Sequence, residues 1–245
     1  MIDEQVHQSS LIITILIFCF AIIHSGGASL RNKVEPLIGE RLWRIIFAIA
    51  SIPSALILIA YFLVHRYDGI RLWNFQGSPF SFYIVWLLTA ISFIFLYPAT
   101  YNLLEIPAIQ KPTVRIYSTG IMRVTRHPQA FGQILWCIAH SYWIGTSFMI
   151  VTSFGLILHH LFAIWHGDKR LEYKFGEEFF RYKSKTSIIP FKAIIDGRQK
   201  LQMREFLKPS QIGICIAIAV LWWSHRFISS GTNALISSKL AEFFS

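Results

Sequence analysis

The chain has 245 residues, of which 54% are hydrophobic and 15% charged, and its formal net charge is +10. A soluble domain of this length usually carries about 25% charged residues, so the composition excludes an ordinary soluble domain. The basic residues lie between long apolar blocks, which favours a membrane over a nucleic acid as their partner.

The first ten residues do not have the pattern of a targeting peptide. They include Asp3 and Glu4 and no Lys or Arg, whereas signal and transit peptides are basic in this region. We therefore expect the membrane domain to begin with the first apolar block, at Leu11. All the cysteines lie inside apolar blocks, which argues against a disulfide framework: they are Cys19, Cys137 and Cys215.

Six apolar segments approach the length of about 20 residues that a membrane-spanning helix needs. They are Leu11–Leu30, Leu42–Val64, Phe80–Leu103, Gln129–Gly145, Ser147–His166 and Gln211–Ile228. The fourth and fifth are separated only by a short turn near Gly145, which predicts an antiparallel helical hairpin. The predicted fold is all-α, a transmembrane helical bundle that forms a single membrane domain over residues 1–245.

The basic residues are distributed unevenly between the predicted loops. With the N-terminus outside, 19 of the Lys and Arg residues fall on the inner side and 4 on the outer side. Inner loops are enriched in Lys and Arg. The asymmetry therefore favours six spans with both termini on the outer, or lumenal, side.

One inner segment, residues 167–210, holds 11 of these basic residues. It is amphipathic as well as basic, a combination that is typical of segments lying on an anionic leaflet. We expect it to lie on the inner leaflet, and a solvated connector is the alternative interpretation.

Four histidines lie inside predicted spans, where ionisable residues are rare and usually functional. They are His24, His140, His159 and His160. A rise of about 1.5 Å per residue would place them in a common layer of the bilayer. Neutral imidazole is a frequent metal ligand, and a haem iron takes two such ligands from different helices, a need that His24 and His140 would meet. Alternatively, each histidine bonds a polar group on a neighbouring helix.

Cys137 precedes His140 by three residues, so the two share one face of a helix. A thiolate is also a haem ligand, and Cys137 could compete with His140 for iron. The alternative is that Cys137 is an ordinary buried residue.

The fourth predicted span begins with the sequence TRHP at residues 125–128. Proline suits the first turn of a helix. Arg126 and His127 would then lie at the inner interface, where they could bind a phosphate or carboxylate or simply anchor the helix. We count them as candidate cofactor-binding residues. The acids of the following inner segment, beginning with Asp168, are expected to pair with nearby bases and fix the loop.

Several stretches, taken in order, resemble one known family. They are Ala21–Arg31 (AIIHSGGASLR), Gly120–Gln129 (GIMRVTRHPQ), Gln133–His140 (QILWCIAH), Gly155–His160 (GLILHH), Trp165–Arg170 (WHGDKR) and Lys185–Pro190 (KTSIIP). The set is similar to the NnrU-type membrane family, and within it to enzymes of oxygenic phototrophs. The resemblance covers roughly residues 18–195. The WCIAH sequence followed by the histidine pair is its most specific part.

The resemblance implies an isomerase that converts 9,15,9′-tri-cis-ζ-carotene to 9,9′-di-cis-ζ-carotene with a non-covalent haem b. It implies His24 and His140 as axial ligands and Cys137 as the alternative ligand after oxidation, with activity in the reduced state. His159 and His160 match a family pair, and we include them among the cofactor-binding candidates. The family also implies contact with membrane lipid and transient contact with carotene desaturases. The expected location is a cyanobacterial inner or thylakoid membrane, or a plastid membrane.

Two other functions fit parts of the sequence. A membrane methyltransferase of the isoprenylcysteine or phospholipid type, using S-adenosylmethionine, also has an RHP-like element and a later acidic stretch before a proline. It would leave His24 without a role. The other alternative is a haem-bearing accessory protein that leaves carotene unchanged. Binding of the methyl donor tests the first alternative, and neighbouring genes for carotene desaturation or nitric-oxide reduction test the second.

Overall fold

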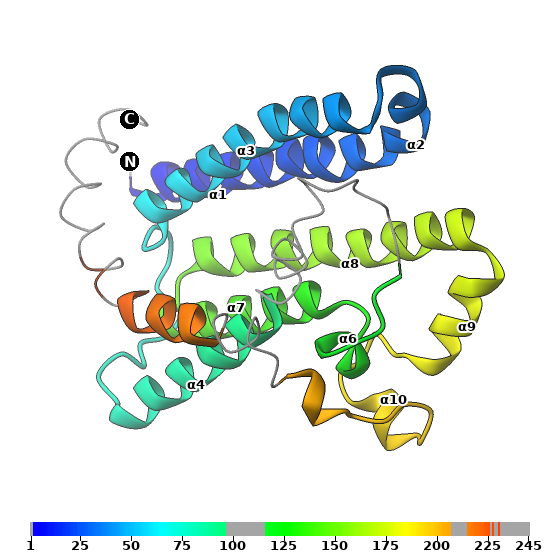
Figure 1. Ribbon diagram of the computed structural model, residues 1–245. Helices are drawn as coiled ribbons and strands as arrows, with labels where there is room; N and C mark the ends of the chain where they lie inside the picture. Colours follow the sequence, from blue (N-terminus) through cyan, green and yellow to red (C-terminus); the bar gives the residue numbers. More distant parts are fainter. Residues whose placement is uncertain (1, 97–115, 207–214, 226, 228–229, 231–245) are drawn as a thin grey trace. The chain divides into compact units, whose positions relative to one another are not determined.

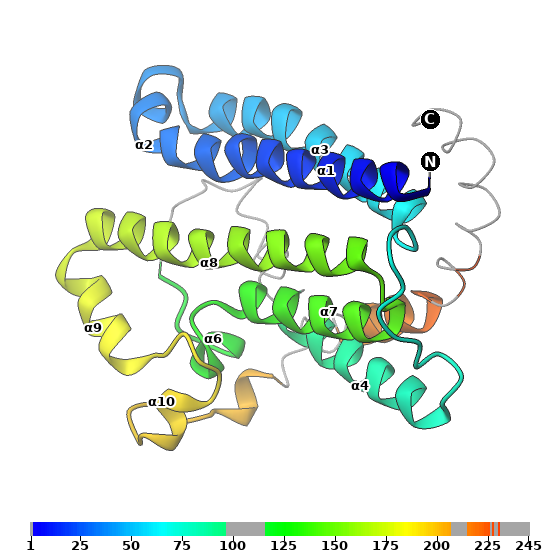
Figure 2. The ribbon, with the colours of Figure 1, turned by 180° about the vertical axis from the view of Figure 1, so that it is seen from behind.

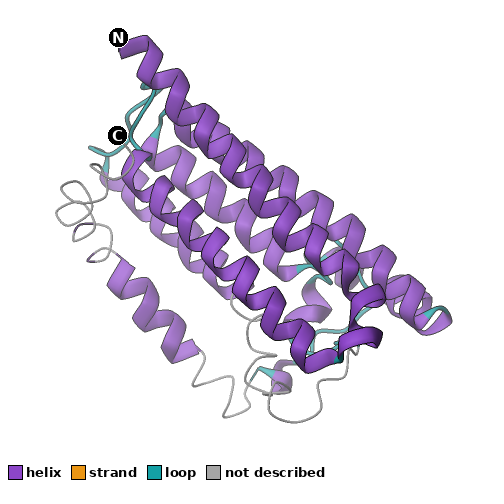
Figure 3. Cartoon of the chain, turned by 90° about the horizontal axis from the view of Figure 1, so that it is seen from above, coloured by secondary structure: helices purple, strands orange, loops and turns teal. Residues whose placement is uncertain are grey.

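The computed structural model describes residues 2–96, 116–206, 215–225, 227 and 230. In this part of the chain the regular structure is helical, as Figure 3 shows, and the only β-pairing is an isolated bridge between Arg71 and Thr146. The predicted all-α class is confirmed.

The helices follow one another with short connections (Figure 1). They are α1 (Ile2–Ala21), the π-helix η1 (Ile22–Gly26), α2 (Gly27–Ile38), α3 (Glu40–His65), α4 (Pro79–Leu96), α6 (Ile121–Val124), α7 (Pro128–Ile144), α8 (Ser147–Phe175), α9 (Glu177–Lys185), α10 (Lys192–Ile195) and the 3₁₀-helix η2 (Met203–Glu205). A further apolar helix spans Cys215–His225.

Four of the described helical stretches are long and apolar enough to cross a membrane. They are Gln8–Ile38, Glu40–His65, Pro79–Leu96 and Ser147–Phe175. They contain the first, second and fifth predicted spans and the described part of the third, whose end lies outside the described residues. The fourth predicted span is the 17-residue helix α7, and Cys215–His225 is the described part of the sixth. Six crossings, and termini on the outer side, remain predictions.

The chain divides into two compact units, in contrast to the expected single domain. The first unit contains Met1–Trp86, Cys137–His159 and His225–Ser245. The second contains Leu87–Trp136 and His160–Ser224.

In the first unit, α1 and α3 lie side by side, as both Figure 1 and Figure 2 show. The chain reverses between α2 and α3 at Gly39, whose φ of 86° favours glycine. Glu40, the first residue of α3, accepts hydrogen bonds from Arg31 at 2.8 Å and from Arg44 at 2.7 Å. The ion pairs therefore join α2 to α3 at the turn.

The predicted hairpin is confirmed in the first unit, where α7 and α8 are joined at Gly145. Gly145 has a φ of 67°, and a Cβ there would lie 2.2 Å from the Trp73 carbonyl oxygen, so only glycine fits. The indole of Trp73 donates a hydrogen bond to the Tyr142 carbonyl at 3.0 Å. The segment before α4 is thereby fixed to the hairpin turn.

In the second unit, α4 and α7 approach closely at Gly132. A Cβ there would lie 2.6 Å from the Leu96 nitrogen and 2.8 Å from the Ser92 carbonyl oxygen. The Ser92 hydroxyl donates a hydrogen bond to the Gly132 carbonyl at 2.8 Å. Small residues and serine hydroxyls are typical of helix contacts in membranes.

Candidate functional site

His24 lies in the π-helix η1, between α1 and α2. The amide of Gly27 donates to the carbonyl of Ile22, five residues earlier, and this wider turn contains one more residue than an α-helical turn. Single π-turns of this kind occur frequently at functional sites. The backbone therefore marks His24 independently of its residue type.

The imidazole of His24 is oriented by a neighbouring helix. Its Nδ1 is 2.7 Å from the hydroxyl oxygen of Ser51, a buried residue of α3. When Nδ1 donates to that hydroxyl, Nε2 presents a lone pair, which is the form that binds a metal ion. Phe20 stacks on the ring at 5.1 Å and Phe47 lies at 5.4 Å, so the surroundings are otherwise apolar.

His159 is the second histidine at this place in the first unit. It lies on α8, is buried, and its ring centroid is 6.3 Å from that of His24. Phe20 contacts both rings, at 5.1 Å and 5.3 Å. The prediction that these two histidines lie in a common layer is confirmed. His160 follows about 100° further around the helix axis and belongs to the second unit.

His140 and Cys137 lie together on α7, as predicted from their spacing. Cys137 is buried, with 1% of its surface exposed. The ring centroid of His140 is 5.9 Å from that of His225, at the end of the helix Cys215–His225. The Trp86 ring lies 6.4 Å from His225.

The histidine rings of the first unit thus form two close pairs, His24 with His159 and His140 with His225. The sequence reasoning overlooked His225, although its position in an apolar predicted span was a sufficient signal. It also assigned His24 and His140 as one ligand pair. That assignment stays a prediction, and the structure adds His159 as the histidine beside His24.

These pairs suit a metal that brings most of its own ligands. Among the described residues, no three His, Cys, Asp or Glu side chains come together as metal ligands. A porphyrin supplies four equatorial nitrogens, so its iron requires only one or two ligands from the protein. An oriented imidazole among aromatic rings, as at His24, fits that requirement.

Arg126 and His127 form a separate cluster in the second unit. The guanidinium of Arg126 donates two hydrogen bonds to Asp168 Oδ2, at 2.9 Å and 3.1 Å, and His127 Nε2 is 2.7 Å from Oδ1. The three side chains are between 8% and 16% exposed. Burial raises the pKa of Tyr182, whose neutral phenol interacts electrostatically with Arg126 and Asp168.

The carboxylate that Arg126 and His127 bind is therefore internal, and the cluster fixes the start of α7 to α8. This outcome confirms the expectation that Asp168 pairs with nearby bases. The neighbouring backbone is held as well, because the Thr125 hydroxyl donates to the Ile188 carbonyl at 2.7 Å. The two cations are occupied by a protein carboxylate, which weakens the case for a methyl-donor site here.

The chain was compared with known proteins. The sequence model of the family described as "NnrU protein" matches residues 12–231. A curated relative from Zea mays, named "15-cis-zeta-carotene isomerase, chloroplastic", is 45% identical over 228 residues, which are 92% of this chain and 62% of the relative. A protein of the same name from Arabidopsis thaliana is 49% identical over 223 residues, 90% of this chain and 61% of the relative. The chain thus spans about three fifths of the length of these relatives. No solved structure matches it.

Proposed function

The chain belongs to the NnrU family, and from this we propose that it isomerises the central 15-cis double bond of 9,15,9′-tri-cis-ζ-carotene to give 9,9′-di-cis-ζ-carotene. The observation that carries the proposal is the identity to two curated relatives whose names state this activity, over nine tenths of the chain. The sequences that first suggested the family lie within the matched region.

The physical setting supports such a substrate. A carotene is a long hydrocarbon that partitions into lipid, so an enzyme that acts on it belongs in or on a membrane. Four described helical stretches are apolar enough to span a bilayer, and many of their large apolar side chains are exposed. We propose a multi-pass protein of a cyanobacterial or plastid membrane.

We further propose that the protein binds haem b, with His24 as one axial ligand. Haem, when bound, would supply an iron that exchanges electron density with the polyene and so lowers the order of the bond that rotates. The Ser51 hydroxyl would hold Nδ1 of His24, and Phe20 and Phe47 would keep water from the ring. This role of Ser51 corresponds to the outer-shell partner that metal-bound histidines usually have.

The second axial ligand is His140 by resemblance to the family, while His159 is the histidine that lies beside His24 in the structure. We propose His140 as the ligand in the reduced protein, and Cys137, on the same face of α7, as its replacement after oxidation. In that arrangement His159 would line the site of His24 without binding iron.

Optical spectra of the purified protein in detergent test the ligand assignment. The wild type, His24→Ala, His140→Ala and His159→Ala are compared oxidised and after reduction with dithionite. We expect haem to be lost in the first two variants and retained in His159→Ala. Retention in His140→Ala with loss in His159→Ala would instead make His159 the partner of His24.

A carotene assay tests the activity itself. Tri-cis-ζ-carotene is supplied to reduced and oxidised protein in lipid, and the products are separated chromatographically. We expect di-cis product from the reduced wild type alone. Haem binding without conversion of the carotene would favour the accessory-protein interpretation, and a protein that binds no haem would refute the cofactor proposal.

A further inference from the structure

Residues 177–206 of the second unit, which we call the basic lobe, form a folded structure that is fixed to α6. The Phe191 amide donates to the Val124 carbonyl at 2.9 Å. The guanidinium of Arg123 binds both carboxylate oxygens of Glu205, at 2.8 Å and 2.7 Å, and the side chain of Gln199 at 2.8 Å. These bonds favour a fixed orientation, which an open solvated connector would not need.

An apolar tip projects from this lobe between Thr186 and Gly197. Its side chains are Ile188, Ile189, Phe191 and Ile195, with 40%, 62%, 48% and 81% of their surfaces exposed. Phe191 has a φ of 62°, a left-handed conformation that is costly for a residue other than glycine. An exposed aromatic residue in a costly conformation gains nothing in water, whereas burial in an apolar phase would offset the cost.

Basic side chains surround the apolar tip. Between positions 181 and 204 the chain has seven Lys and Arg residues and one acid, Asp196. That acid is neutralised locally, by Arg198 at 2.9 Å and Lys192 at 3.7 Å. The lobe therefore presents a positive field around an apolar projection.

We propose that the basic lobe is an anionic-lipid docking element, in which the apolar tip enters the boundary between headgroups and acyl chains and the surrounding Lys and Arg bind lipid phosphates. Segments with this composition lie in the interfacial plane of membranes, and each Lys or Arg near an anionic surface strengthens the attraction. The proposal does not depend on haem or on the isomerase activity.

The test places an environment-sensitive label on the tip. Ile195→Cys is introduced into protein whose three native cysteines are replaced by alanine, labelled with a nitrobenzoxadiazole group, and reconstituted in nanodiscs. The discs contain phosphatidylcholine alone or with phosphatidylglycerol, each with and without nitroxide-labelled lipid. Tyr173→Cys is the control, because Tyr173 is 84% exposed near the end of α8, outside the lobe.

We expect nitroxide lipid to quench the label at position 195 several times more strongly in the anionic discs, and raised salt to reduce this difference. Quenching at position 173 should not depend on lipid charge. Lys192→Gln and Lys200→Gln should each lower the inserted population in anionic discs about fivefold.

Three results would overturn the proposal. Absence of quenching in both discs would make the lobe a solvated connector. Equal quenching in both would exclude recognition of anionic headgroups, and a blue-shifted emission without lipid quenching would indicate a protein partner instead. If the cysteine-free protein does not fold, benzoylphenylalanine in place of Phe191 in the native chain answers the same question, because only a lipid-inserted ring would form lipid adducts on illumination.

Discussion

The hydrogen bond between Ser51 and His24 can be removed with little other change. Ser51→Ala deletes one hydroxyl, which is buried and lies 2.7 Å from Nδ1 of His24. Burial prevents a water molecule from readily taking its place, so the imidazole would lose both its orientation and the bias toward one tautomer. Loss of an outer-shell partner typically lowers metal affinity about 10- to 100-fold, equivalent to about 1.4–2.7 kcal/mol.

Titration of the haem-free protein with haemin in detergent, followed by absorbance, measures this effect. Ser51→Thr keeps a hydroxyl and should bind close to the wild-type affinity. Ser54→Ala is the matched control, because the Ser54 hydroxyl donates to the Ser51 carbonyl one turn away and does not contact His24. Thermal unfolding of each variant separates an effect on binding from a loss of stability, which should be about 1 kcal/mol.

An affinity of Ser51→Ala within twofold of the wild type would refute this reasoning, provided that His24→Ala has lost haem. The hydrogen bond would then be an ordinary contact between helices. If His24→Ala also binds haem normally, His24 is not a ligand, and the proposal for the whole site is wrong.

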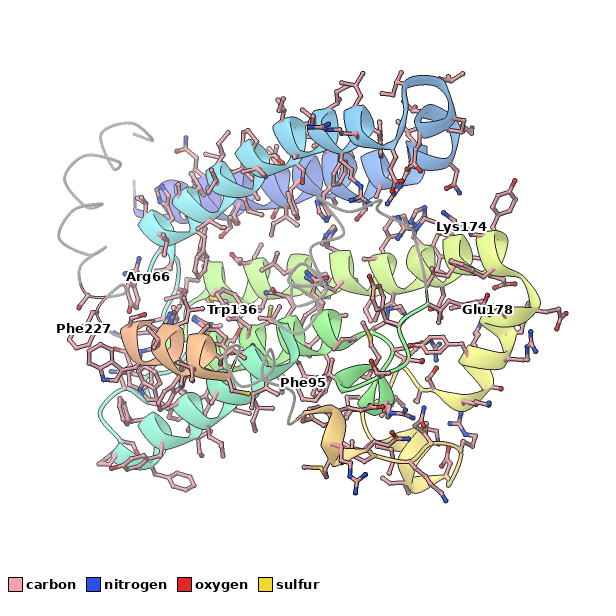
Figure 4. All side chains as sticks on the ribbon, in the orientation of Figure 1. Arg66, Phe95, Trp136, Lys174, Glu178 and Phe227 are labelled. Atoms are coloured by element: carbon pink, nitrogen blue, oxygen red, sulfur yellow. The ribbon has the colours of Figure 1, made fainter. Side chains whose placement is uncertain are left out.

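Three further predictions concern stability and the oxidised state. Asp168→Asn should lower the unfolding free energy in detergent by about 3–5 kcal/mol, because two buried cations lose their carboxylate, whereas Glu178→Gln, on exposed α9 (Figure 4), should have little effect. Gly132→Ala should cost more than about 1–3 kcal/mol, since its methyl group would meet backbone atoms of α4 at 2.6 Å and 2.8 Å; Gly77→Ala, with open space around it, is the control, and equal melting temperatures would contradict the packing argument. Cys137→Ala should change the oxidised haem spectrum and leave the reduced spectrum unchanged; an unchanged oxidised spectrum would remove Cys137 as a ligand.

The sequence predicted those features that depend on local pattern. Apolar blocks of sufficient length gave α1, α3 and α8, and the short connection at Gly145 gave the hairpin. The spacing of Cys137 and His140 correctly placed both on one helix, because a three-residue separation corresponds to nearly one turn.

The features that it did not predict depend on contacts between distant residues. Ser51 lies 27 positions after His24, and its role becomes visible only when α3 packs beside η1. Asp168 lies 42 positions after Arg126, so the anion that this arginine binds could not be identified from a local motif. His225 was missed because its partner, His140, lies on a helix 85 residues earlier in the chain.

The backbone around His24 and Ser51 argues that their contact is functional. A hydrogen bond between two helices requires no irregularity in either of them. Here, however, the chain widens into a π-turn at His24, and α3 contains Pro53, which removes an amide donor two residues after Ser51. Both irregularities cost energy and both lie beside the same 2.7 Å contact. Local departures from regular structure of this kind concentrate at functional sites, where geometry is selected over stability. The Ser51→Ala titration examines this argument directly, because the substitution leaves both irregularities in place and removes only the contact that they surround.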